Sequence, residues 1–126
     1  PAAVTLTQKD IREFQLAKSA IRAGLTTLVE QAGLTPEQLG AIYLAGGLGF
    51  YIHTESAVRV GMLPDGLAGR IRPVGNTSLA GAALCLCDAA RLAELEAIAE
   101  SCRTVDLNQI PAFADCFVEH MLFPEI

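Results

Sequence analysis

The sequence predicts a single α/β domain, and three features lead to that prediction. Apolar runs of strand length alternate along the chain with longer segments whose apolar residues recur at helical spacing. Hydrophobic residues make up 52% of the 126 residues and charged residues 18%, which indicates a substantial core and excludes a disordered chain. A glycine-rich stretch, LAGGLGF (44–50), directly follows one apolar run, as at the strand–helix junctions of α/β proteins.

The beginning of the chain predicts an extended segment, a long helix and a short helix. Residues 2–7 (AAVTLT) alternate apolar with small or polar residues, which is typical of a strand or an extended arm. Thr7 and Asp10 have the spacing of a weak capping box, and apolar residues then recur at steps of three and four along one helix face. Gly33 is expected just beyond the end of this helix, and LTPEQL (34–39) predicts the short one.

The middle of the chain predicts two strands joined through a short helix. The elements are a strand at 41–45 (AIYLA), a helix from a Thr54 cap to Gly61, a turn at 63–66 (LPDG) and a strand at 70–75 (RIRPVG). Gly46 and Gly47 interrupt the first strand, and Pro73 favours an edge or end position in the second.

The last part predicts a second long helix, a further strand and a final helix. Asn76 or Thr77 is the expected cap of a helix that runs from Ser78 to about Glu100. A strand at 102–107 (CRTVDL) and a helix at 110–122 follow. The expected architecture is therefore a small sheet flanked by two long helices.

Charge and hydropathy exclude several classes of partner. The net charge is −5 with no run of like charges, so we expect neither nucleic acid nor a membrane surface as a partner. No apolar stretch approaches the roughly 18 residues that a membrane-spanning helix needs. The N-terminal residues lack a signal-peptide pattern, and the start at Pro1 suggests a fragment excised from a longer protein.

The four cysteines predict reduced thiols in a cytoplasmic protein and no metal site. They lie at Cys85, Cys87, Cys102 and Cys116, without a CxxC spacing. His53 and His120 have no nucleophile at a suggestive spacing, so no catalytic residue is predicted.

The glycine-rich stretch leaves two interpretations open. Glycine has no Cβ, so a flat ring or a phosphate can approach the backbone at Gly46 and Gly47. GGLG is neither GxGxxG nor a Walker loop, so a purely structural turn remains the alternative. A second cluster of small residues, GNTSLAGAA (75–83), predicts either ordinary helix–sheet packing or a hinge against a second lobe.

Taken together, the motifs resemble a known family. TQKDIREFQLAKSAI (7–21), AIYLAGGLG (41–49), GMLP (61–64) and RIRPVGNTSLAGA (70–82) occur in an order similar to the C-terminal domain of the reductive activators of corrinoid proteins. The resemblance runs from about Leu6 to Pro124. These proteins belong to the superfamily of acetate and sugar kinases, heat-shock chaperones and actin. The resemblance implies a ribonuclease-H-like fold, here the second lobe of the actin-like ATPase.

The resemblance also implies a nucleotide site. ATP lies between two lobes in this superfamily, and the glycine pair on the adenosine side corresponds to Gly46 and Gly47. Phe50 stands where chaperone relatives place an arginine against the adenine, and its ring is able to stack instead. In this superfamily a helix of small residues crosses between the lobes, and its residues correspond to Asn76, Ala80 and Gly81 here. The cofactor-binding residues expected from all of this are Gly46, Gly47, Gly49, Phe50, Asn76 and Gly81. Leu48 is a mild departure, since family members often have Phe there.

The implied function belongs to a longer parent protein. It uses ATP with Mg to drive electron transfer from a 2Fe–2S cluster, outside this fragment, to Co(II) cobalamin on a corrinoid protein. The fragment is expected to be inactive alone and to need the missing N-terminal lobe, and a homodimer is a further expected assembly. Two alternatives remain: a non-catalytic dimerisation or partner-docking module, and an activator of 2-hydroxyacyl-CoA dehydratases.

Overall fold

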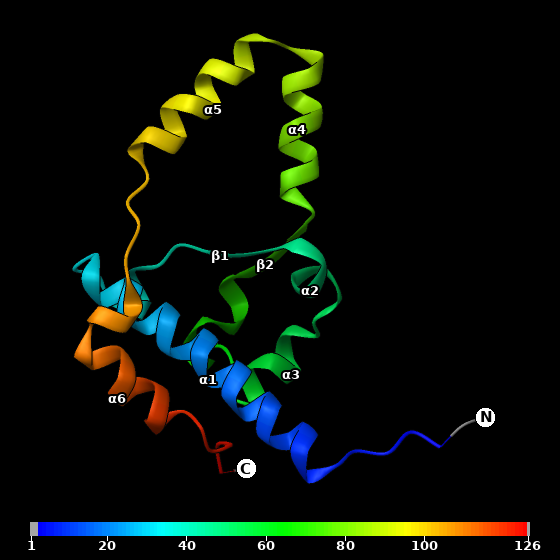
Figure 1. The fold of residues 1–126 in the computed structure, drawn as a ribbon, viewed down its shortest axis with the longest axis vertical. Helices are drawn as coiled ribbons and strands as arrows, with labels where there is room; N and C mark the ends of the chain where they lie inside the picture. The colour runs from blue at the N-terminus through cyan, green and yellow to red at the C-terminus, as the bar shows by residue number, and fades with distance from the viewer. Residues whose placement is uncertain (1–2, 126) are drawn as a thin grey trace.

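A two-stranded parallel sheet lies at the centre of the structure, a computed structural model that describes residues 3–125 except the side chain of Leu48. The strands are β1 (Ile42–Ala45) and β2 (Ile71–Gly75) (Figure 1). The helices are α1 (Gln8–Gln31), α2 (Gly46–Tyr51), α3 (Thr54–Arg59), α4 (Thr77–Cys87), α5 (Ala90–Ser101) and α6 (Pro111–Glu119). Short 3₁₀ helices lie at Pro36–Gln38, Asp65–Arg70 and Leu107–Gln109.

The sheet is parallel because the chain between its strands crosses back through α2 and α3. Ile42 lies opposite Ile71. Ile71 belongs to a buried apolar cluster with Ala57 and Val58 of α3 and with Met62 and Leu63, which follow this helix, and Ile42 packs against the cluster. Burial of each such aliphatic side chain contributes about 1.5–3 kcal/mol. The predicted strands at 41–45 and 70–75 are confirmed, and this cluster holds them against the crossover.

Helix α1 packs along α6 and the C-terminal residues. Lys18 and Ser19 are fully buried on α1, where their side chains donate to the carbonyl oxygens of Leu122 and Phe117. The Phe14 and Phe123 rings stack with centroids 6.2 Å apart. Burial, together with the nearby charge of Arg22, lowers the pKa of Lys18. The long first helix is confirmed, and polar contacts to main-chain oxygens join it to the end of the chain.

The ends of the first helix follow the sequence closely. Thr7 and Asp10 form the predicted capping box: Thr7 Oγ1 accepts the Asp10 N–H at 3.2 Å, and Asp10 Oδ2 accepts the Thr7 N–H at 2.8 Å. The Thr7 hydroxyl also donates to Asp10 Oδ2, at 2.6 Å, and this bond together with that from the Thr7 N–H lowers the pKa of Asp10. Gly33 has a φ of 69° beyond the helix end, as expected.

The cap of α3 is His53, which corrects the prediction of Thr54. Thr54 is the first residue of the helix, and His53 Nδ1 accepts the Ser56 N–H at 3.4 Å. His53 has the extended backbone of a cap residue, with φ −78° and ψ 108°. The imidazole nitrogen of His53 therefore accepts the backbone N–H at the start of the helix, where the sequence pattern predicted the Thr54 hydroxyl.

The strand predicted at 102–107 is absent from the described residues, and at the beginning of the chain the structure shows the extended arm that was the alternative to a strand. Residues 3–7 are exposed and extended but pair with no strand, and residue 2 lies outside the described part. Residues 102–106 are likewise exposed and lead into a 3₁₀ helix that Asp106 caps by accepting the Asn108 N–H. A strand needs a neighbouring backbone to pair with, and neither edge of the sheet reaches these segments.

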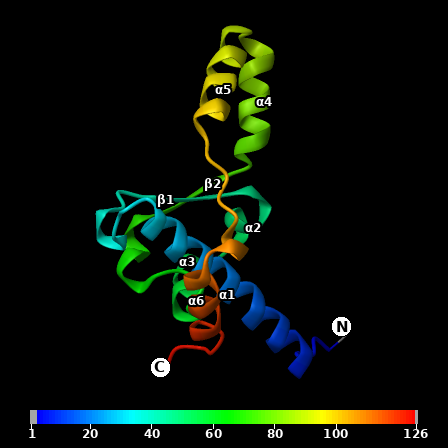
Figure 2. The same cartoon turned by 60° about the vertical axis from the view of Figure 1, so that its left-hand side comes forward.

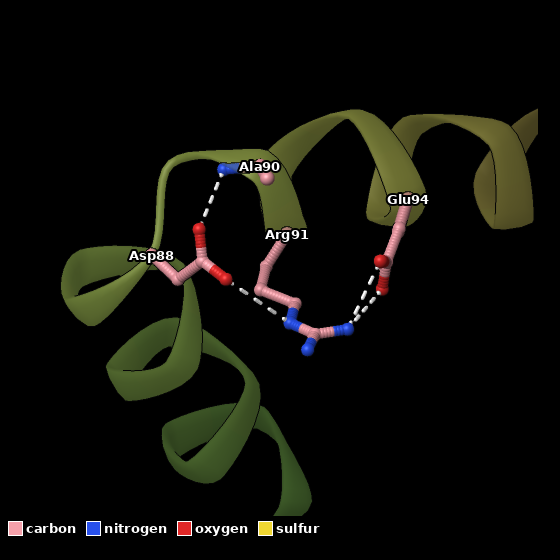
Figure 3. A network of polar contacts seen from close by, with 4 residues as sticks. All are labelled: Asp88, Ala90, Arg91 and Glu94. Carbon is pink, nitrogen blue, oxygen red and sulfur yellow. Dashed lines mark hydrogen bonds and ion pairs between the residues drawn. The ribbon is translucent and has the colours of Figure 1, made fainter.

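The second long helix is broken at Asp88, which corrects the prediction of a continuous helix from 78 to 100. Asp88 has φ −145° and ψ 106°, so the chain leaves helical geometry there. Its Oδ1 accepts the Ala90 N–H at 3.0 Å, and its Oδ2 lies 3.5 Å from Arg91 Nε (Figure 3). Arg91 also reaches Glu94 at 2.8 Å. The carboxylate thus starts α5, because aspartate competes for the backbone N–H groups that a continuous helix would use.

Helices α4 and α5 project away from the rest of the molecule as a hairpin (Figures 1 and 2). Neither helix has a buried residue. Leu79, Leu84 and Leu86 on α4, and Leu92, Leu95 and Ile98 on α5, are all at least half exposed. Within residues 3–125, no helix is both long enough and apolar enough to cross a membrane.

Candidate functional site

The two parallel strands end side by side, and each is followed by a glycine in the left-handed region. Gly46 follows β1 with φ 83°, and Gly75 ends β2 with φ 70°. Ala45 lies opposite Gly75 in the register, so the two turns leave the sheet at the same edge. The carboxyl edge of a parallel sheet is where α/β proteins commonly bind ligands. Only glycine adopts this backbone without strain, so the positive φ alone accounts for a glycine at position 46 and at position 75.

The glycine-rich stretch forms the short helix α2 and opens onto a surface cavity. The cavity has a volume of about 320 Å³ and is lined by Gly46, Gly47, Phe50, Tyr51, Gly75 and Asn76. A Cβ built on Gly46 or on Gly47 would meet no other atom within 4 Å. The bare backbone therefore faces open space, and the glycine pair is not packed beneath another helix. This volume is near the lower end of the range for small-molecule sites.

Two aromatic side chains form one wall of this cavity. Phe50 is 61% exposed and Tyr51 is 84% exposed, although both are large apolar rings. Their centroids lie 5.1 Å apart with perpendicular planes. Behind Phe50, a Cβ at Gly75 would lie 3.6 Å from its Cδ2, so the ring rests close to the second glycine turn. The exposed face of Phe50 is available for a flat ring to stack on.

Asn76 lines the cavity where helix α4 begins. Its Oδ1 accepts the Leu79 N–H at 3.0 Å, and its main-chain oxygen accepts the Ala80 N–H at 3.1 Å. Asn76, and not Thr77, is the cap of α4, which decides between the two predicted caps. The residue therefore joins the cavity to the base of the projecting hairpin.

The structure brings four of the six expected binding residues together: Gly46, Gly47, Phe50 and Asn76. Gly49 lies elsewhere, because it is buried against β1. A Cβ there would lie 2.9 Å from the Leu44 carbonyl carbon and 3.0 Å from its oxygen. Gly81 is one turn further along α4 and does not line the cavity.

Sequence reasoning missed two residues of the cavity wall. Gly75 was visible as a glycine between a strand and a helix cap, the same signal that singled out Gly46. Tyr51 follows Phe50 directly and carried no signal beyond being a second aromatic residue after the glycine pair.

Several other chemically capable side chains among the described residues have local or structural contacts. Cys116 Sγ lies 3.5 Å from His120 Nδ1, which is also 2.9 Å from the Cys116 carbonyl oxygen. Burial raises the pKa of the Cys116 thiol, which favours its protonated form. Arg70 donates to the carbonyl oxygens of Glu37 and Leu39 and so has a structural role. In the part of the chain that is described, His, Cys, Asp and Glu side chains form no group of three suited to a metal ion.

Comparison with known proteins decides the family. Residues 1–126 match the model of a family described as the C-terminal domain of RACo, the ASKHA domain. The chain belongs to this family. It therefore has the second lobe of the acetate and sugar kinase, chaperone and actin fold, and the predicted fold class is confirmed.

Individual members of the family support the same assignment. The corrinoid activation enzyme RamQ of Eubacterium limosum is 32% identical over 120 residues, which are 95% of this chain and 20% of the relative. The [Co(II) methylated amine-specific corrinoid protein] reductase of Methanosarcina barkeri is 38% identical over 97 residues, which are 77% of this chain and 18% of the relative. A solved reductive activator for a corrinoid, iron–sulfur protein superposes with a TM-score of 0.87 at 33% identity, covering 95% of this chain and 19% of that one.

The family match, the sequence identities and the structural superposition confirm the predicted resemblance to the reductive activators of corrinoid proteins. The chain spans about a fifth of the length of the relatives that it matches.

Proposed function

We propose that this domain is the nucleotide-binding half-lobe of an ATP-dependent reductive activator of a corrinoid protein. The observation that carries the proposal is the open cavity at the carboxyl edge of the sheet, with two bare glycines and an exposed aromatic ring. In the full-length protein, we expect a second lobe, the N-terminal one, to close the cavity and to hold the phosphates and Mg²⁺.

The lining fits the nucleoside part of ATP better than its phosphates. No lysine or arginine lines the cavity, so nothing in this half would neutralise a triphosphate. Phe50 offers a ring face for the adenine, and Gly46 and Gly47 allow the sugar to approach the backbone. The charge of the phosphates therefore requires groups outside the described residues, which agrees with a site shared between two lobes.

The proposed reaction of the parent protein is electron transfer to cobalamin. ATP binding and hydrolysis would drive an electron from a 2Fe–2S cluster to Co(II) cobalamin on the partner, returning it to Co(I). All four cysteines of this chain are free; Cys87 and Cys102 are exposed, and Cys85 is on the projecting helix α4. They do not form a cluster site in this domain, so the electron donor belongs to another part of the parent. The names of the relatives favour a corrinoid partner over a 2-hydroxyacyl-CoA dehydratase.

Replacing Phe50 with alanine tests the adenine contact. In the full-length protein, Phe50→Ala should weaken ATP binding roughly fivefold to a hundredfold, because stacking of a base on an aromatic side chain contributes about 1–3 kcal/mol. Isothermal titration calorimetry measures the change.

Tyr43→Ala is the matched control for Phe50→Ala. Tyr43 is an aromatic residue that is 69% exposed on β1 and does not line this cavity. It should leave ATP affinity unchanged. Equal ATP affinity in Phe50→Ala and the wild type would contradict the adenine contact.

We also propose a partner-docking role for the α4–α5 hairpin, on the observation that its leucines are exposed on a projecting element. Leu86 is 89% exposed, and residues 77–87 contain no charged side chain. Exposed apolar surface of this extent is typical of an interaction site. Because Asn76 both lines the cavity and caps α4, we expect the N-terminal lobe that closes the cavity to cover the hairpin as well. Docking of a second copy, as in a homodimer, is the alternative outcome.

Hydrogen exchange distinguishes these occupants. In the full-length protein, backbone amides of residues 77–101 should exchange slowly and independently of concentration if the same polypeptide covers them. Leu86→Glu should speed this exchange by placing a charge in an apolar interface. Leu6→Glu, at a residue that is 75% exposed outside the hairpin, should not. Slow exchange only at high protein concentration would identify a second copy instead, and fast exchange throughout would refute docking.

A further inference from the structure

We draw no further inference here: the strongest candidate, the apolar groove between helix α1 and strand β1 that Ile21, Tyr43, Leu44 and Met62 line, is left uncovered by residues 3–125, and nothing in the structure shows what covers it in the full-length protein.

Discussion

Replacing Gly47 with valine in the full-length protein is expected to weaken ATP binding by roughly fivefold to a hundredfold, since a side chain that crowds a bound ligand costs about 1–3 kcal/mol. Gly47 lies in the cavity, its φ is not in the left-handed region, and a Cβ there meets nothing within 4 Å. The valine side chain therefore enters the cavity in which we propose that ATP binds, without straining the backbone. Gly46 would be a poorer choice, because its φ of 83° adds backbone strain to any substitution.

Gly40→Val provides the control for this experiment. Gly40 also has open space around a built Cβ and no left-handed φ, and it does not line the cavity. It should leave ATP affinity unchanged in the same titration. Identical binding curves for Gly47→Val and the wild type would remove the glycine pair from the nucleotide site.

Replacing Gly49 with alanine is expected to destabilise the domain by about 1–3 kcal/mol, because an extra methyl group would overlap packed atoms. The built Cβ lies 2.9 Å from the carbonyl carbon of Leu44 and 3.1 Å from its Cβ. These atoms belong to β1 of the two-stranded sheet and cannot turn aside as the end of a flexible side chain can. Thermal unfolding should show a lower melting temperature.

Gly47→Ala is the matched control, two residues earlier in the same helix. Its methyl group points into open space, so alanine should leave stability unchanged or raise it by about 0.4–1 kcal/mol through a smaller entropy of the unfolded chain. Equal melting temperatures for Gly49→Ala and Gly47→Ala would show that β1 and α2 separate easily. Gly49 would then have no packing role.

Local patterns were sufficient where a few neighbouring residues determine the structure. Thr7 and Asp10 predicted the start of α1 because a capping box closes its hydrogen bonds within four residues. Gly33 predicted its end for the same local reason. The glycines after β1 predicted the strand–helix junction that opens the cavity, since their lack of a Cβ is a property of the residue itself.

Local patterns gave the wrong secondary structure where a distant strand partner or a competing hydrogen bond determines the backbone conformation. Residues 102–107 have the composition of a strand, but no backbone lies beside them to pair with. The helical pattern from 78 to 100 continues across Asp88, whose carboxylate instead accepts the N–H of Ala90, the first residue of a new helix. Periodicity does not register this competition, because it counts apolar spacing and not hydrogen bonds.

The sequence by itself determined the family, the glycine pair and the aromatic residue that follows it, because motif order and residue type are written in the chain. Only the tertiary structure decided that Gly75 and Tyr51 complete the cavity, and that Gly49 serves packing instead. The physical reason is the parallel register: pairing of Ala45 with Gly75 brings two turns 30 residues apart in the sequence to one edge of the sheet. That proximity comes from strand pairing, which local sequence patterns do not record.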